Sequence, residues 1–232
     1  MKKIFKTCCF GFLILGLSFV IIAGILMSIY SIQKIKLKSK CELPCWHGIT
    51  VGETQEDDAI KVISNLPKVD YKVSTNSHRR YYGSIDTVYF AMYPWFNLFY
   101  LVDGAIYFKE NETVYMELRG GLGKNVGQVI EKYGEPAYVY IKSERPSIIN
   151  ACLFYPEIGL IFEASKILEF DEIKNNTRIY GLTVIKPKDF QAYVENSGMY
   201  PVKEPYQSIF VPWSGYGELR GKYWFPGGQD KY

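Results

Sequence analysis

The chain has 232 residues, 48% of them hydrophobic, which is enough for one medium domain or two small ones around a packed core. Its 27 basic and 24 acidic side chains give a net charge of +3, but seven of the lysines lie in residues 1–40, where no acidic residue occurs. The rest of the chain therefore carries 20 basic and 24 acidic side chains. A mildly acidic body without a basic stripe excludes nucleic acid as an expected partner.

The first predicted element is the uncharged apolar segment Phe10–Tyr30, which follows a short basic N-terminus of residues 1–9. As a helix this segment would be about 31 Å long, which matches the hydrocarbon core of a bilayer. It is longer than the apolar region of a cleaved signal peptide, about 7–15 residues, and no small-x-small cleavage site follows it. The sequence therefore predicts an uncleaved single-pass membrane anchor.

The orientation of this anchor follows less directly, because lysines flank it on both sides and the positive-inside rule is nearly balanced. Long domains translocate largely regardless of charge, so we expect the N-terminus inside and the body outside the cytoplasm. A membrane-anchored cytoplasmic domain is the alternative. Residues 31–43 are expected to form a polar stalk between the anchor and the body.

Three cysteines belong to the stalk and body, and CELPCWHG brings two of them within four residues. A zinc site needs about four ligands, and the chain has only two histidines and no second ligand pair, so we expect no metal. The C-x-x-x-C spacing also differs from the C-x-x-C of redox motifs. Outside the cytoplasm a disulfide is expected. Cys41 and Cys45 are its candidates, and Cys152 is the rival partner for Cys45.

The first half of the body, residues 44–119, begins with a predicted helix. In ITVGETQEDDAIKVISNLP, Thr54 is the expected N-cap, and Asp57 would complete a variant of the capping box. Apolar residues recur on one helical face, and Asn65-Leu66-Pro67 is expected to end the helix. Strands are expected at 86–92, 99–108 and 113–119, with hairpin turns at 102–104 and 110–112.

The second half, residues 120–197, repeats this order of elements. Asn125 is expected to cap a second helix, with Gln128 completing a capping box and Gly134 at the C-terminal end. Strands are expected at 137–142, 148–155, 159–164 and 177–185, and a short closing helix at 187–195.

Together these elements predict an α+β fold, in which an N-terminal transmembrane helix is followed by short helices packed on antiparallel sheet. The two halves read as tandem helix-then-sheet units produced by an internal duplication. The same order of segments is also typical of α+β proteins without a duplication, and the sequence leaves both interpretations open.

The C-terminal segment, residues 198–232, is rich in aromatic residues, proline and glycine. It is too aromatic for a simple disordered tail. Either the segment docks on the sheet and covers an apolar face, or it is a binding surface for a protein, lipid headgroups or a glycan. The candidate contact residues of such a surface are Trp213, Tyr216, Tyr223 and Trp224.

Signatures of a known reaction are missing from the sequence: it contains no nucleophile elbow, no H-E-x-x-H and no kinase-type motif. Carboxylates such as Glu117, Glu163 and Glu169 could pair as in a glycosidase site, but the sequence does not indicate that they meet. We therefore expect no catalytic residue and no cofactor.

Several motifs resemble a known group of proteins. PCWHGITVGET, followed by an acidic helix start, resembles small exported bacterial proteins with Pro-Cys-Trp-x-Gly-Ile-x-x-Gly-x-Thr. VGQVIEKYGEPAYVY and LFYPEIGLIFEA resemble their second half. The helix segments are also similar to those of SmpA/OmlA-type outer-membrane assembly lipoproteins, which share an architecture with β-lactamase-inhibitor proteins: short helices packed on an antiparallel sheet, sometimes in tandem.

This resemblance covers residues 43–186 and implies a non-enzymatic binding or envelope role, without catalytic residues to carry over. The chain departs from the lipoproteins because an apolar helix stands where they have a lipidated cysteine. We therefore expect a single-pass anchored protein with an extracytoplasmic, non-catalytic domain that binds an envelope protein or glycan. An envelope hydrolase acting on glycans or peptides is the alternative.

Overall fold

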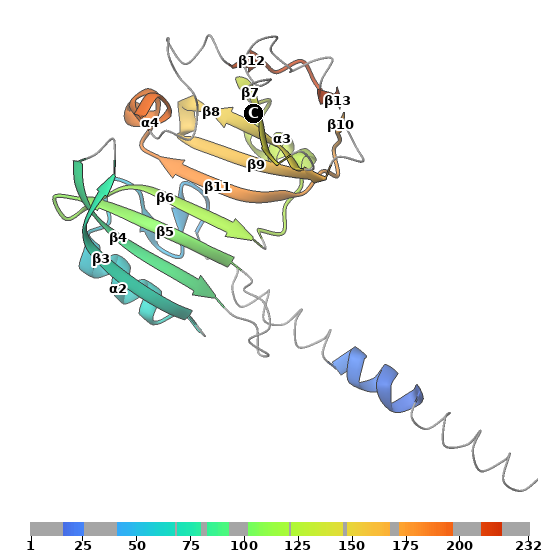
Figure 1. The fold of residues 1–232 in the computed structure, drawn as a ribbon, viewed down its shortest axis with the longest axis horizontal. Coiled ribbons are helices and arrows are strands. Elements are labelled where there is room, and N and C mark those ends of the chain that lie inside the picture. Colours follow the sequence, from blue (N-terminus) through green and yellow to red (C-terminus); the bar gives the residue numbers. More distant parts are fainter. Residues whose placement is uncertain are drawn as a thin grey trace, which may run out of the picture.

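The computed structural model describes a large part of the chain, and every structural statement below concerns that part. The described residues are 16–25, 41–67, 69–79, 83–92, 102–120, 122–145, 148–167, 172–196 and 210–219. They form an α+β fold with one large antiparallel sheet and a few short helices (Figure 1). The predicted α+β class is therefore confirmed.

The large sheet has nine strands in the order β12-β7-β8-β9-β11-β6-β5-β4-β3, and every neighbouring pair is antiparallel. Its strands are β3 (Val69–Arg79), β4 (Gly83–Met92), β5 (Val102–Lys109), β6 (Glu112–Gly120), β7 (Tyr138–Arg145), β8 (Ile148–Tyr155), β9 (Leu160–Ile167), β11 (Ile179–Ile185) and β12 (Val211–Pro212). Two small ladders pair β1 (Cys45–Trp46) with β2 (Ile49–Thr50) and β10 (Glu172–Ile173) with β13 (Gly217–Glu218).

Among its described residues the body has three short α-helices, α2 (Glu56–Ser64), α3 (Val126–Tyr133) and α4 (Phe190–Asn196), and two 3-10 turns, η1 (Pro156–Ile158) and η2 (Pro187–Asp189). One order of elements occurs twice along the chain: α2 precedes β3 to β6, and α3 precedes β7, β8, β9 and β11. The last strands of the two sets, β6 and β11, pair with each other in the middle of the sheet.

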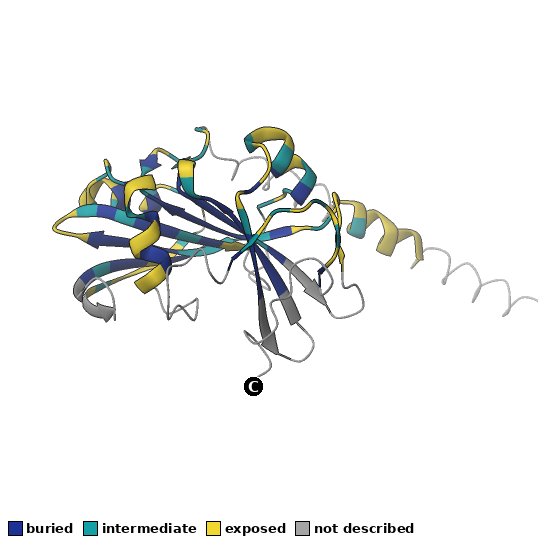
Figure 2. Cartoon of the chain, turned by 90° about the horizontal axis from the view of Figure 1, so that it is seen from above, coloured by how far each residue is buried: buried dark blue, intermediate teal, exposed yellow. Residues whose placement is uncertain are grey.

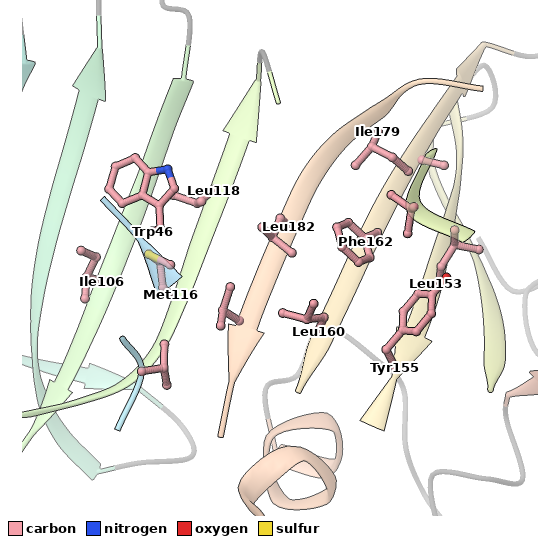
Figure 3. Packing of buried hydrophobic residues seen from close by; sticks show 14 of the residues in the cluster. Trp46, Ile106, Met116, Leu118, Leu153, Tyr155, Leu160, Phe162, Ile179 and Leu182 are labelled. Atoms are coloured by element: carbon pink, nitrogen blue, oxygen red, sulfur yellow. The ribbon is translucent and has the colours of Figure 1, made fainter. Parts of the chain in front are cut away.

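Side chains alternate between the two faces of the sheet, and each face has its own apolar cluster. The helix-pair face carries Ile106, Met116 and Phe162 (Figure 3). It is covered by α2, α3 and the β1–β2 ladder. The opposite face, which we call the α4 face, carries Tyr115 and Phe154 and is covered by α4 and Phe210. Figure 2 shows the central strands as buried and the outer helix surfaces as exposed.

The start of α3 confirms the predicted capping box. The Asn125 side chain accepts a hydrogen bond from the Gln128 backbone N–H at 2.9 Å, and the Gln128 side chain accepts one from the Asn125 N–H at 3.1 Å. All partners lie within four residues, so the signal is entirely local. Gly134 ends the helix with a φ of 80°, which favours glycine, but its ψ of −174° lies outside the left-handed helical region, so the predicted left-handed cap is not formed.

The predicted start of α2 is wrong. Gln55 is the N-cap residue and makes no side-chain capping bond, while the Thr54 hydroxyl accepts from the Thr50 N–H at 2.8 Å. The N–H of Glu56 instead donates to the side-chain and backbone oxygens of Asn111, both at 3.2 Å. Asn111 lies in the turn between β5 and β6, so the cap comes from a distant part of the chain.

The difference between these two helix starts can be tested by alanine substitution at each N-cap. Asn125→Ala is expected to lower the free energy of unfolding by about 1 kcal/mol, because it removes a side-chain cap. Gln55→Ala, at an N-cap without a capping bond, is expected to change it by less than about 0.5 kcal/mol. Chemical denaturation of both variants measures the difference, and equal losses would contradict the assignment of the two caps.

Two predictions for the strands are also corrected. The strand β3 was not expected, because its second half, Ser-Thr-Asn-Ser, has the composition of a turn. The predicted turn at 102–104 lies within β5. Position 104 requires glycine, because a Cβ atom there would overlap the Glu117 carbonyl oxygen and lie 2.6 Å from Cζ of Phe90.

The predicted anchor segment is described only in part. Residues 16–25 form a helix, and the remainder of Phe10–Tyr30 lies outside the described residues. No helix among the residues that the structure describes is long and apolar enough to cross a membrane.

Candidate functional site

A group of polar residues lies at the centre of the α4 face, where β6, β11 and β9 run side by side. Strand register places Glu117 opposite Thr183 and Arg119 opposite Gly181 across β6 and β11. On the other side of β11, Gly181 also lies opposite Glu163 of β9. The glycine thus separates an arginine and a glutamate that lie two strands apart.

The missing side chain at Gly181 makes room for the Glu163 carboxylate. A Cβ atom built on Gly181 would lie 3.0 Å from Oε2 of Glu163 and 3.1 Å from its Cβ atom. A small recess opens at this point, with a volume of about 10 Å³, enough for one water molecule. Its lining residues are Glu117, Leu118, Arg119, Glu163, Gly181, Leu182 and Thr183.

Two tyrosines hold the Glu117 carboxylate at the edge of this recess. The hydroxyl of Tyr193 on α4 donates to Oε1 at 3.2 Å, and the hydroxyl of Tyr107 on β5 donates to Oε2 at 3.4 Å. The ring of Tyr115 stacks on Tyr107 at 4.0 Å and meets Tyr193 edge-on at 5.0 Å. Because these three rings are buried, the position of Glu117 is set by packing as well as by hydrogen bonds.

The charge of the site is mixed and its sum is negative. Partial desolvation lowers the pKa of the Arg119 guanidinium, but the charges of Glu117, Glu163 and then Asp103 raise it by more, so that it lies above its ordinary value. Asp103 lies directly opposite Arg119 on β5. Three carboxylates around one guanidinium give a net charge of −2, which favours a cationic group on a bound molecule.

The cysteine candidates lie on different faces of the sheet: the Cys41–Cys45 loop adjoins the helix-pair face, whereas Cys152 lies on the α4 face, opposite Glu163 of β9. Cys41 and Cys45 form a disulfide with a Cα–Cα distance of 5.7 Å, and Cys152 is buried in β8 outside this bond. The disulfide loop also contacts the second half of the body, since Lys132 of α3 lies 3.0 Å from the carboxylate of Glu42. The loop is therefore held against the folded body by this ion pair.

The aromatic candidates divide into two pairs. Trp213 is half-buried against the apolar cluster of the helix-pair face, and Tyr216 is exposed and meets its ring edge-on at 5.7 Å. Tyr223 and Trp224 lie outside the described residues. Residues 210–219 dock on the sheet: β12 pairs with β7, Phe210 is buried on the α4 face and Leu219 on the helix-pair face. The segment therefore wraps the β7 edge.

Of the three carboxylates considered from sequence, the structure brings Glu117 and Glu163 to one recess, and Glu169 lies outside the described residues. Sequence reasoning missed Arg119, Gly181 and the tyrosines that hold Glu117. In MELRG, polar and apolar residues alternate, which indicates that Glu117 and Arg119 share one face of their strand. The position of the glycine in IYGLT likewise indicates its face. Neither pattern indicates which strands are neighbours in the sheet. Among the described residues, no group of three or more histidines, cysteines or carboxylates is arranged to hold a metal ion.

Comparison of the chain with protein-family models, with curated proteins and with solved structures found no match.

Proposed function

We propose that the chain is a membrane-anchored binding protein, held by the segment Phe10–Tyr30 and presenting its α+β body outside the cytoplasm. The exposed apolar surface of the helix over residues 16–25 supports the anchor. Six of its large apolar side chains are between 53% and 75% exposed, and Figure 1 draws this helix (blue) apart from the sheet. A helix that is apolar all round requires an apolar surrounding such as lipid.

The proposed contact surface is the recess around Gly181 on the α4 face. The proposal of a binding function rests on this recess. Arg119, Glu117 and Glu163 converge there from two strands, in positions fixed by strand register and by buried tyrosines. Together with Asp103 of β5, these groups sum to a net charge of −2, which suits a partner that presents a lysine or arginine side chain. We therefore propose an envelope protein with a basic contact residue as the partner.

A hydrolase is the second candidate, because Glu117 and Glu163 meet at one recess. One observation favours binding. The recess, at about 10 Å³, is too small to enclose a sugar ring or a peptide bond.

The orientation can be tested by thiol labelling of intact cells. Glu157 is exposed in the body, so Glu157→Cys in a chain with Cys8→Ser and Cys9→Ser is expected to react with a membrane-impermeant maleimide before lysis. The same chain without Glu157→Cys is the background control. Labelling of Glu157→Cys only after lysis would contradict the extracytoplasmic placement and favour the cytoplasmic alternative.

The contact surface can be tested by photo-crosslinking in cells. Ala91 lies beside Asp103 on the α4 face, so a photoreactive residue at this position is expected to capture a partner protein. Glu117→Gln with Glu163→Gln removes the negative sum of charge and is expected to lower the yield about tenfold. The control pair Asp58→Asn and Glu157→Gln removes two exposed carboxylates elsewhere and is expected to leave it unchanged. Equal crosslinking yields from both double variants would contradict the assignment of the recess as the contact surface.

The hydrolase alternative predicts a different result. Release of a shortened glycan or peptide by the wild-type chain, but not by Glu117→Gln with Glu163→Gln, would favour the hydrolase.

A further inference from the structure

The strand β3 is the outer edge of the sheet. Among the described residues it pairs with β4 on one side, and the sheet order ends there. An edge strand presents a row of backbone N–H and C=O groups that can pair with another strand. The first part of β3, Val-Asp-Tyr-Lys-Val at 69–73, is the part that pairs regularly with β4, because a register shift follows between Ser74 and Ser77.

The exposed side chains of this segment alternate between the two faces. Tyr71 is 44% and Val73 37% exposed, and both lie opposite core residues of the helix-pair face. Asp70 and Lys72 are exposed on the other face. A tyrosine and a valine at an open edge leave apolar area in water, although they are directed to the side of the sheet that α2 packs against.

The sequence of the segment is symmetric about Tyr71 in the properties that matter for pairing. Valine flanks it at two residues on either side, and opposite charges flank it at one residue on either side. If two copies of the segment run antiparallel with Tyr71 opposite Tyr71, Asp70 of each copy meets Lys72 of the other. Val69 of each copy then meets Val73 of the other. Charges of opposite sign and apolar pairs at directly opposite positions both stabilise antiparallel strands.

We propose that this edge is a self-association surface, in which a second copy of the chain pairs antiparallel with residues 69–73 about a two-fold axis at Tyr71. The two nine-stranded sheets then form one continuous sheet. Charge selects the register. A shift of two residues in either direction places Asp70 opposite Asp70 or Lys72 opposite Lys72. A shift of one residue brings side chains of opposite faces together. The inference does not depend on the proposed function.

Cysteine crosslinking of the full chain in membranes tests the register. In a background of Cys8→Ser and Cys9→Ser, Tyr71→Cys places two thiols at the axis, where opposed Cα atoms lie about 4.5–5.5 Å apart, within disulfide range. Rapid formation of a covalent dimer on mild oxidation is expected. The control Thr75→Cys lies on the same strand, but its two copies would be about 26 Å apart and are not expected to crosslink.

Charge exchange provides the second arm. Asp70→Lys or Lys72→Asp, added to Tyr71→Cys, places like charges opposite each other twice in the dimer and is expected to slow crosslinking about tenfold. The combined exchange Asp70→Lys with Lys72→Asp restores both attractive pairs and is expected to return the rate to within about twofold of the starting chain. Equal crosslinking of Tyr71→Cys and Thr75→Cys, or failure of the combined exchange to restore the rate, would overturn the proposal.

Discussion

Replacement of Trp46 by alanine is expected to lower the free energy of unfolding by about 3–5 kcal/mol, as for other large aromatic side chains removed from a core. Trp46 is only 8% exposed and stacks on Phe90 with ring centroids 5.0 Å apart. Figure 3 shows its ring lying over β5 and β6 beside Leu118 and Met116. Its removal would leave a cavity on the helix-pair face that the short β1–β2 ladder cannot close.

The loss would also affect the disulfide loop. Trp46 follows directly on Cys45, so the same residues that end the disulfide loop also enter the core. Chemical denaturation followed by circular dichroism measures the effect. The matched aromatic control is Tyr216→Ala on an exposed ring, which is expected to cost less than about 1 kcal/mol. A loss for Trp46→Ala no greater than that of the control would show that the ring does not contribute to the core.

Replacement of Gly159 by alanine is expected to cost about 3 kcal/mol, through backbone conformation and overpacking together. Gly159 has a φ of 67° after the η1 turn, in the left-handed region. A Cβ atom there would overlap the backbone carbonyl oxygen of Ile185, which cannot move away easily because the Ile185 N–H donates to the Gly159 oxygen at 2.8 Å. The turn before β9 and the end of β11 are thus in direct backbone contact.

The control separates the two causes. Gly215 also has a positive φ, of 90°, but a Cβ atom there would meet nothing within 4 Å. Gly215→Ala therefore carries only the conformational cost, about 1–2 kcal/mol. Thermal and chemical unfolding of both variants measures the difference. If the two variants lose the same free energy, the close approach at Ile185 contributes nothing to the requirement for glycine.

The helices show which parts of the fold are readable from sequence. The start of α3 follows from Asn125 and Gln128, whose capping bonds span three residues. The start of α2 does not, because Asn111 supplies its cap across 55 residues. The same contrast holds for the strands: seven of the sheet strands carry apolar alternation that predicts them, whereas β3 is an edge strand whose polar second half resembles a turn.

The convergence of the candidate site residues could not be predicted from the sequence, for a similar reason. Glu117 and Glu163 meet only because β11 inserts between β6 and β9 and places Gly181 between them. Strand order is a long-range property, since consecutive strands need not be neighbours, and β9 and β11 are separated in the chain by β10. The tyrosine hydroxyls on Glu117 come from β5 and α4, which are 86 residues apart from Tyr107 to Tyr193.

The sequence by itself determined the α+β class, most strand positions, the capping of α3 and the candidacy of Cys41 and Cys45, because each depends on residues close together in the chain. Only the tertiary structure decided the strand order, the cap of α2, the docking of residues 210–219 and the meeting of Arg119 with two glutamates at Gly181. Those features depend on which strands pair across the sheet. Pairing is governed by the burial of two whole faces at once, and no local pattern records it.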